Sequence, residues 1–192
     1  MKLGEIAELM IGVLTKREQE ENGKNTYKVF SLKNYEDKLE YETIKTNKNL
    51  NNKLTKKGNL LFRLVYPNKI IYITEELEGL LVPSQFCIIK TERNKLNPIV
   101  LKWYLESDQG KASLRNKITG SIIKSIPVSN LKNLEIPAIS LKNQEEMEKL
   151  ISLWTKEKEI TEEILEEKEK LYNSYLEKMV NKEVRNIAKK KK

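Results

Sequence analysis

The sequence predicts an α+β protein, with one mixed α/β domain followed by a long C-terminal coiled-coil helix. Two patterns predict this class. Up to about residue 140, short runs rich in β-branched and aromatic residues alternate with helical spacing, and neither period dominates. From residue 141 to residue 185 the chain has no Gly or Pro and is dense in Glu and Lys. The expected divisions are a folded domain at 1–140, a long helix at 141–185 and a basic disordered tail at 186–192.

The first half of the expected domain contains one short helix and most of the strands. Apolar residues at helical spacing within 3–10 predict a short helix or turn. Residues 15–25 have the composition of a loop, and the Lys-, Asn- and Thr-rich residues 46–59 predict a flexible basic loop. Strands are predicted at 27–32, 60–65, 69–73 and 80–90, with a turn at 66–68.

The second half of the domain begins with a helix that has a clear start signal. Asn97 is a favoured N-cap residue and Pro98 a favoured first helical residue. Apolar spacing then predicts a helix over 98–107, continued over 109–118 after a break. Short apolar runs at 121–126 and 134–139 complete the domain.

The segment after residue 140 predicts one long helix, with Ser140 as a candidate N-cap and Asn143 with Glu146 as a second capping pair slightly later. At about 1.5 Å per residue it spans on the order of 65 Å, too long to be buried against a domain of this size. Its apolar residues recur at spacings of 3, 4 or 7, as in a coiled-coil seam, so a second helix is expected to cover them. A second copy of the chain is the simplest source of that helix, in parallel or antiparallel pairing, and a lone solvated helix is the alternative. The predicted dimerisation seam consists of Leu150, Leu153, Ile160, Ile164, Leu171, Tyr175 and Met179.

Charge separates the domain from the helix. The chain carries 36 Lys and Arg against 28 Asp and Glu, a net charge of +8. Residues 1–140 carry +7, residues 141–183 carry −4, and residues 184–192 carry +5. A basic domain before an acidic helix favours a polyanion as partner of the domain and a protein as partner of the helix. A surface that lysines only keep soluble is the alternative explanation.

Missing residue types narrow the chemistry. The chain has no His and a single Cys, which excludes His-based catalytic triads, His-ligated zinc and intramolecular disulfides. Cys87 lies in an apolar run and is expected to be a buried structural thiol. Asp37 and Asp108 are the only aspartates, and the sequence gives neither a clustered partner, which argues against two-metal hydrolysis. We therefore expect no catalytic residue, no metal site and no cofactor.

No segment has the composition of a membrane span. The longest run without a charged residue covers 79–89, far short of the about 20 residues that cross a bilayer. Glu5 and Glu8 interrupt any signal-peptide core at the start of the chain. The expected location is the cytoplasm.

Three segments, in this order, carry a recognisable pattern. The first is Leu-Gly-Glu-Ile-Ala-Glu-Leu at 3–9 with Gly12, and the second is Leu-Thr-Lys-Lys-Gly-Asn-Leu-Leu-Phe at 54–62. The third combines Gly-Ser-Ile-Ile-Lys-Ser-Ile at 120–126, Leu-Lys-Asn-Leu-Glu-Ile-Pro at 131–137, Leu141 and Gln144. Together they resemble the specificity (S) subunits of type I restriction-modification systems. Asn59 stands where that family usually has Asp, and Ala138-Ile139 departs from a further proline common there.

The resemblance implies a fold and a function. Family members usually alternate two target-recognition domains with two helical spacers, and this chain resembles half of such a subunit. That implies a homodimer, or a pair with a second half-subunit, in which each domain reads one half of a bipartite site in double-stranded DNA. The spacer helices would dock the modification methyltransferase, which brings the S-adenosylmethionine and the catalysis, and the complex can include an endonuclease. This chain would be a non-catalytic DNA-recognition subunit.

Candidate DNA-binding residues follow from the chemistry of DNA. Lys and Arg neutralise phosphates, Arg pairs with guanine, and Asn or Gln pairs with adenine. With five Arg against 31 Lys, few residues are suited to reading bases, and we expect them in the basic loops and turns. A dimeric coiled-coil adaptor without DNA specificity is the alternative function, and a solvated surface charge is the alternative for each residue. The expected set is Lys16, Arg17, Lys53, Lys56, Lys57, Arg63, Asn68, Lys69, Arg115, Lys117, Ser121 and Lys124.

Overall fold

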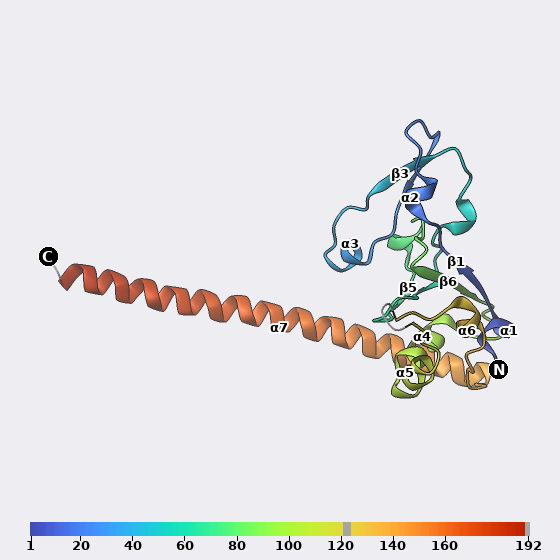
Figure 1. Ribbon diagram of the computed structural model, residues 1–192. Coiled ribbons are helices and arrows are strands. Elements are labelled where there is room, and N and C mark those ends of the chain that lie inside the picture. Colours follow the sequence, from blue (N-terminus) through green and yellow to red (C-terminus); the bar gives the residue numbers. More distant parts are fainter. Residues whose placement is uncertain (121–123, 191–192) are drawn as a thin grey trace. The chain divides into compact units, whose positions relative to one another are not determined.

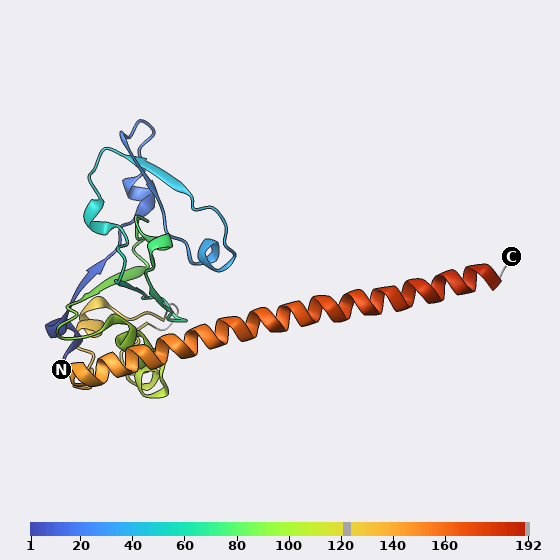
Figure 2. The ribbon, with the colours of Figure 1, turned by 180° about the vertical axis from the view of Figure 1, so that it is seen from behind.

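The computed structural model describes residues 1–120 and 124–190, with side chains described as far as Asn181 (Figures 1 and 2). The chain divides into two compact units, Met1–Glu148 and Lys149–Lys192. The first unit mixes helices and strands, and the described part of the second belongs to one long helix. The structure thus confirms the predicted α+β class with a long C-terminal helix.

An antiparallel sheet of four strands forms the centre of the first unit. Its strands stand in the order β1 (Ala7–Ile11), β6 (Phe86–Thr91), β4 (Leu60–Arg63) and β5 (Ile70–Tyr72). The central strand β6 pairs with β1 on one side and with β4 on the other. The first and the last strand of this sheet along the sequence, β1 and β6, therefore lie side by side.

Both faces of the central strand β6 are buried over residues 86–89. Cys87 and Ile89 of β6 point into the hydrophobic cluster on one face, and Phe86 and Ile88 point into the cluster on the other. None of these four side chains is exposed. A strand covered on both faces has an unbroken apolar sequence instead of an alternating one, which explains why 86–89 contains no polar residue.

Four helices contribute to the cluster on the first face, namely α1 (Leu3–Ile6), α4 (Pro98–Glu106), α5 (Asp108–Arg115) and α6 (Val128–Lys132). Asn97 caps α4, since its Oδ1 accepts a hydrogen bond from the backbone N–H of Ile99 at 2.9 Å. The predicted N-cap is confirmed.

The second face is covered by the chain before and after the β4–β5 pair. Phe30 packs edge-on against Phe86, with ring centroids 5.1 Å apart. A separate two-stranded sheet, β2 (Asn25–Lys28) with β3 (Thr43–Thr46), has its own small apolar cluster around Leu50. The short helices of this region are α2 (Thr15–Glu18), α3 (Leu32–Glu36), η1 (Asn51–Lys53) and η2 (Glu75–Leu77).

Several local predictions are wrong. Residues 15–25 are not a loop throughout, since Thr15–Glu18 form α2, and the strand predicted over 80–90 begins only at Phe86. The helical spacing continues past Ile6, yet residues 7–11 form β1, because pairing with β6 satisfies their backbone groups. The strand predicted over 27–32 ends at Lys28 and gives way to α3. Residues 46–59 are not an unsupported flexible loop, since Leu50 and Thr55 are buried and η1 lies among them. In each case tertiary contacts outweigh the local pattern.

Helix α7 runs without a break from Leu141 to Lys190. It is capped as predicted, because the hydroxyl of Ser140 accepts a hydrogen bond from the backbone N–H of Asn143 at 3.3 Å. Its first two turns belong to the first unit, where Gln144 is buried. The proposed limits at 140 and 185 and the disordered tail stay predictions. Among the helices of the described residues, none is long and apolar enough to cross a membrane.

Candidate nucleic-acid interface

A cleft of about 460 Å³ opens in the first unit, between the turn that links β4 to β5 and the helices α4 and α5. Apolar side chains of these elements line part of the cleft, and basic side chains of the turn and α5 line another part. The lining residues are Tyr66, Pro67, Asn68, Lys69, Ile70, Leu105, Glu106, Lys111, Leu114, Arg115 and Ile118. Three of them, Asn68, Lys69 and Arg115, belong to the DNA-binding set predicted from the sequence.

The turn on one side of the cleft is held by its own side chains. The amide nitrogen of Asn68 donates hydrogen bonds to the carbonyl oxygens of Arg63 at 2.9 Å and Leu64 at 3.3 Å. The guanidinium of Arg63 donates to the carbonyl oxygen of Pro67 at 3.3 Å. Arg63 and Asn68 therefore shape the turn, and only the amide oxygen of Asn68 is left without a donor among the described residues.

The other side of the cleft depends on a close contact between α4 and α5. A Cβ atom at Gly110 would lie 2.0 Å from the carbonyl oxygen of Tyr104, so only glycine allows this approach. Ser107 caps α5 by accepting a hydrogen bond from the Gly110 N–H at 3.1 Å. Lys111 and Arg115 follow one turn apart on the same face of α5, and both are exposed. Neither has an ion-pair partner among the residues that the structure describes.

Several other lysines of the predicted set already have partners. Lys57 pairs with Glu75, and this hydrogen-bonded contact raises the pKa of Lys57 and lowers the pKa of Glu75. Lys69 pairs with Glu36. The ammonium of Lys53 donates to the carbonyl oxygen of Ile11 at 2.9 Å. A phosphate would have to replace these partners, whereas Lys56, next to Lys57, is exposed and has no ion-pair partner in the described chain.

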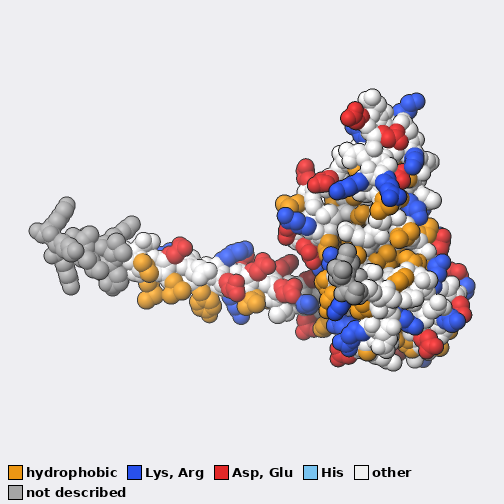
Figure 3. Space-filling view, viewed as in Figure 1, with side chains coloured by type: hydrophobic (Ala, Val, Ile, Leu, Met, Phe, Trp, Pro, Cys, Tyr) orange, Lys and Arg blue, Asp and Glu red, His pale blue; other side chains and the backbone are white. Residues whose placement is uncertain are grey.

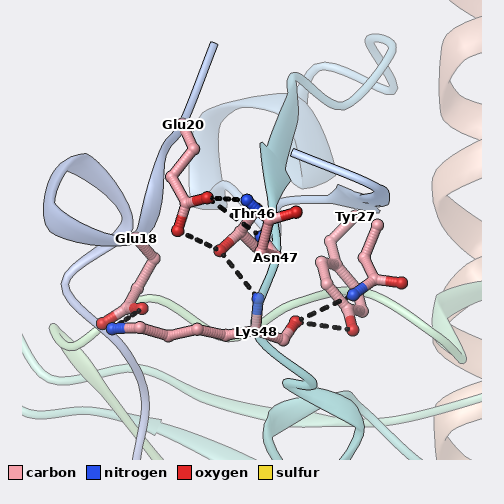
Figure 4. A network of polar contacts seen from close by, with 7 residues as sticks. Glu18, Glu20, Tyr27, Thr46, Asn47 and Lys48 are labelled. Carbon is pink, nitrogen blue, oxygen red and sulfur yellow. Dashed lines mark hydrogen bonds and ion pairs between the residues drawn. The ribbon is translucent and has the colours of Figure 1, made fainter. Parts of the chain in front are cut away.

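A second basic region surrounds the β2–β3 sheet, where a polar network fixes the chain after β3 (Figure 4). Lys48 forms an ion pair with Glu18 at 2.8 Å, and the hydrogen bond to Glu18 raises the pKa of Lys48. The backbone N–H of Asn47 donates to the Glu20 carboxylate at 3.3 Å. The network ties the residues after β3 to α2, which carries the exposed Lys16 and Arg17.

The predicted DNA-binding residues therefore do not gather in one place. Lys16 and Arg17 lie on α2, and Lys56 and Lys57 precede Gly58, whose φ of 84° suits glycine. Lys117 and Lys124 lie on either side of residues 121–123. Ser121 is one of these three residues, which the structure does not describe. Figure 3 shows basic and acidic side chains intermixed over this face of the domain instead of a single basic patch.

Sequence reasoning missed two residues of the cleft, Tyr66 and Lys111. Lys111 could have been found, because it stands four residues before Arg115 on a predicted helix. The sequence pattern places Tyr66 only in a turn, yet the residue is 55% exposed and lines the cleft. No local signal links the two, since the sheet and helix packing brings them together.

The described side chains of α7 beyond Glu148 form a wider apolar surface than the predicted seam. All seven seam residues are exposed, and Figure 3 shows apolar side chains along one side of the helix. Leu153, Ile164 and Tyr175 recur every 11 residues, and so does a neighbouring series shifted by one position. An 11-residue period keeps a stripe almost straight along an α-helix. The exposed apolar residues missed on this surface are Trp154, Leu165, Tyr172, Leu176 and Val180.

The part of the chain that the structure describes holds no group of three or more Cys, Asp or Glu side chains arranged for a metal ion. Cys87 is fully buried, and burial raises the pKa of its thiol to about 12.

Three solved structures share this fold. The S subunit of a type I restriction-modification system from M. genitalium aligns with a TM-score of 0.55 and 20% identity over 81% of this chain. The HsdS subunit from Thermoanaerobacter tengcongensis aligns with a TM-score of 0.59 and 18% identity over 83%. A chain from a structure on complex assembly and conformational transition of the type I restriction-modification system aligns with a TM-score of 0.58 and 17% identity, also over 83% of this chain. No family model and no curated protein matches the sequence.

The resemblance read from the sequence is therefore confirmed at the level of the fold, which is that of type I specificity subunits. The aligned region spans only 38% to 43% of the length of those chains.

Proposed function

We propose that this chain is a specificity subunit of a type I restriction-modification complex. It binds double-stranded DNA through its mixed domain, pairs with a second copy or a second half-subunit through α7, and guides the methyltransferase and endonuclease subunits to their site in the cytoplasm. It is not itself catalytic. The observation that carries the proposal is the specificity-subunit fold over 81% to 83% of the chain.

The charge of the domain supports DNA as its ligand. Lys111 and Arg115 are exposed cations beside a cleft, and Lys16, Arg17 and Lys56 are exposed cations elsewhere on the domain. Such groups neutralise phosphates and release counterions, which supplies the sequence-independent part of the affinity. Arg115 and Asn68, both at the cleft, are the side chains best suited to base edges.

The apolar surface of α7 supports pairing and docking. A two-helix seam needs only a narrow stripe, whereas the exposed apolar residues of α7 extend beyond it, from Leu150 to Val180. A second copy of α7 covers the seam, and the remaining apolar side chains, Trp154 among them, stay available to the methyltransferase. The domain thus binds DNA, and the helix binds proteins.

The test is the salt dependence of DNA binding. Fluorescence anisotropy with a labelled duplex pool, at rising salt concentration, should show an affinity that falls steeply, with a slope of about −0.9 for each phosphate contact. The variant Lys56→Glu with Lys57→Glu should lose most of this binding while the oligomeric state stays unchanged. Lys90→Glu with Lys95→Glu is the matched control, because these lysines lie outside the candidate interface and pair with Glu8 and Glu92.

The ion pairs of Lys57 and Lys69 and the mixed surface charge favour a second candidate function, a coiled-coil adaptor that does not bind DNA. Such an adaptor would show little DNA affinity at any salt concentration, even with the methyltransferase present. That result would refute the proposed function.

A further inference from the structure

The cleft between the Tyr66–Lys69 turn and α5 has the size of a small-ligand site. Its volume of about 460 Å³ lies within the roughly 300–1,000 Å³ usual for such pockets. All of its lining residues belong to the first unit. The residues that line the cleft indicate which kind of ligand it can hold.

One wall of the cleft suits a planar aromatic ring. Tyr66 keeps more than half of its surface exposed, whereas Phe30 and Phe86 of the same domain pack into the core. Ile70, Leu105 and Ile118 provide apolar surface in the same cleft. A nucleobase that stacks on an aromatic side chain gains about 1–3 kcal/mol, whichever base it is.

The part of the cleft that α5 lines suits a phosphodiester. Two of the charged groups at the cleft are already neutralised, because Glu106 pairs with Lys102 at 2.6 Å and Lys69 pairs with Glu36. Lys111 and Arg115 have no such partner in the described chain, so they give the cleft its positive charge. Two cations one helical turn apart fit the oxygens of a nucleotide backbone.

Asn68 adds a polar group with a fixed orientation. Its amide nitrogen is held by the carbonyl oxygens of Arg63 and Leu64, which leaves the amide oxygen as an acceptor. That oxygen can accept from the exocyclic amino group of adenine, cytosine or guanine, and thymine has no such group.

We infer that this cleft holds one nucleotide of a DNA strand turned out of the base stack, with its base against Tyr66 and its phosphates at Lys111 and Arg115. The inference deepens the proposed function and rests on it. A paired base cannot reach such a cleft, so the nucleotide must leave the duplex, which costs least where it is already unpaired. An acidic peptide would use the two cations but not the aromatic wall.

The test compares four labelled duplexes of identical flanking sequence by fluorescence anisotropy with the full chain. One is fully paired, and the others carry a single unpaired deoxyadenosine, thymidine or abasic residue at the same position. The unpaired deoxyadenosine should bind about tenfold tighter than the abasic residue, and thymidine should fall between them. Tyr66→Ala should remove the advantage of the base over the abasic residue, and Tyr66→Phe should keep it.

Trp103→Ala is the matched control, since Trp103 is an exposed aromatic residue of α4 that does not line the cleft. It should change none of the four affinities. Circular dichroism confirms that each variant is folded. Lys111→Ala with Arg115→Ala should weaken binding of all unpaired duplexes.

Equal affinity for the abasic and the base-containing duplexes would overturn the inference, and so would a Tyr66→Ala variant that keeps the difference. Competition by polyglutamate together with such equal affinities would identify the cleft as a surface for acidic proteins. In either case binding of the paired duplex would leave the proposed function standing. If no duplex binds, the proposed function itself fails.

Discussion

Gln144, near the start of α7, makes three hydrogen bonds, and two of them join it to the chain at the start of α4. Its amide oxygen accepts from the backbone N–H of Asn97 at 2.7 Å, and its amide nitrogen donates to the carbonyl oxygens of Lys95 at 3.2 Å and Ile139 at 2.9 Å. Because Gln144 is only 3% exposed, water cannot easily take over these bonds. Gln144→Ala should therefore lower the free energy of unfolding by about 2 kcal/mol, measured by urea denaturation.

Gln109→Ala is the control for this substitution, because Gln109 is exposed in the first turn of α5. It should change the free energy of unfolding by less than about 0.5 kcal/mol. Equal stabilities of the two variants would show that the contacts of Gln144 are not structural. The Leu-x-x-Gln pattern by which the sequence resembles specificity subunits thus has a physical reason in this fold.

Cys87 should be inert toward thiol reagents in the folded protein. Burial raises the pKa of its thiol from 9.0 to about 12, and the reactive species is the thiolate. At pH 8 this shift lowers the thiolate fraction roughly thousandfold, and the surrounding core also blocks access. Labelling with a chromogenic disulfide should be complete in denaturant and negligible without it. Fast labelling of the native protein would mean that β6 opens readily.

At the scale of elements, the sequence predicts what depends on local pattern. The strands β4, β5 and β6, the capped helix α4 and the long helix α7 follow from apolar runs and from cap residues such as Asn97 and Ser140. The strand β1 does not, because its apolar residues fit a helical period as well, and only pairing with β6 decides. The short helix α6 has no side-chain cap to mark it.

The candidate site was harder to predict than the fold. Residue type alone could not show that Lys57 forms an ion pair with Glu75, or Lys69 with Glu36, because the partners lie far apart in the sequence. The same holds for the cleft, which combines a turn after β4 with the last turn of α5. Asn68 and Arg115 were chosen for their chemistry, and packing brings them to one place.

The exposed face of α7 leads to a prediction about association. Ile160→Asp with Ile164→Asp places two charges on the apolar surface, and each isoleucine loses about 1.5–3 kcal/mol of burial in a paired state. The dissociation constant of the pair should rise at least a hundredfold, measured by sedimentation velocity. Glu159→Asp with Lys170→Asp, which lie on the opposite side of the helix and change the net charge by the same amount, should leave association unchanged. A persisting pair in the isoleucine variant would place the interface elsewhere.

At the scale of the whole molecule, the two parts of the chain have different charge and different exposed chemistry. The domain is basic, and two cations at its cleft have no ion-pair partner among the described residues. Residues 141–183 carry a net charge of −4, and the described part of this helix exposes an apolar surface. In the proposed complex the acidic helix would avoid the phosphate backbone, so that DNA and protein partners bind different surfaces. This division predicts that DNA binding and pairing fail independently in variants of the two parts.

The proposed pairing through α7 would fix the geometry of the bipartite DNA site. In a pair joined by α7, a helix of 50 residues and about 75 Å, the distance between the two DNA-binding domains is limited by the helices. Duplexes first selected from a random pool should therefore contain two half-sites at one fixed spacing. Inserting about 5 base pairs between them turns one half-site to the opposite side of the duplex, since B-DNA repeats every 10–10.5 base pairs. Affinity should then drop to that of a single half-site. An unchanged affinity would mean that one domain reads the whole site and that pairing through α7 plays no part in recognition.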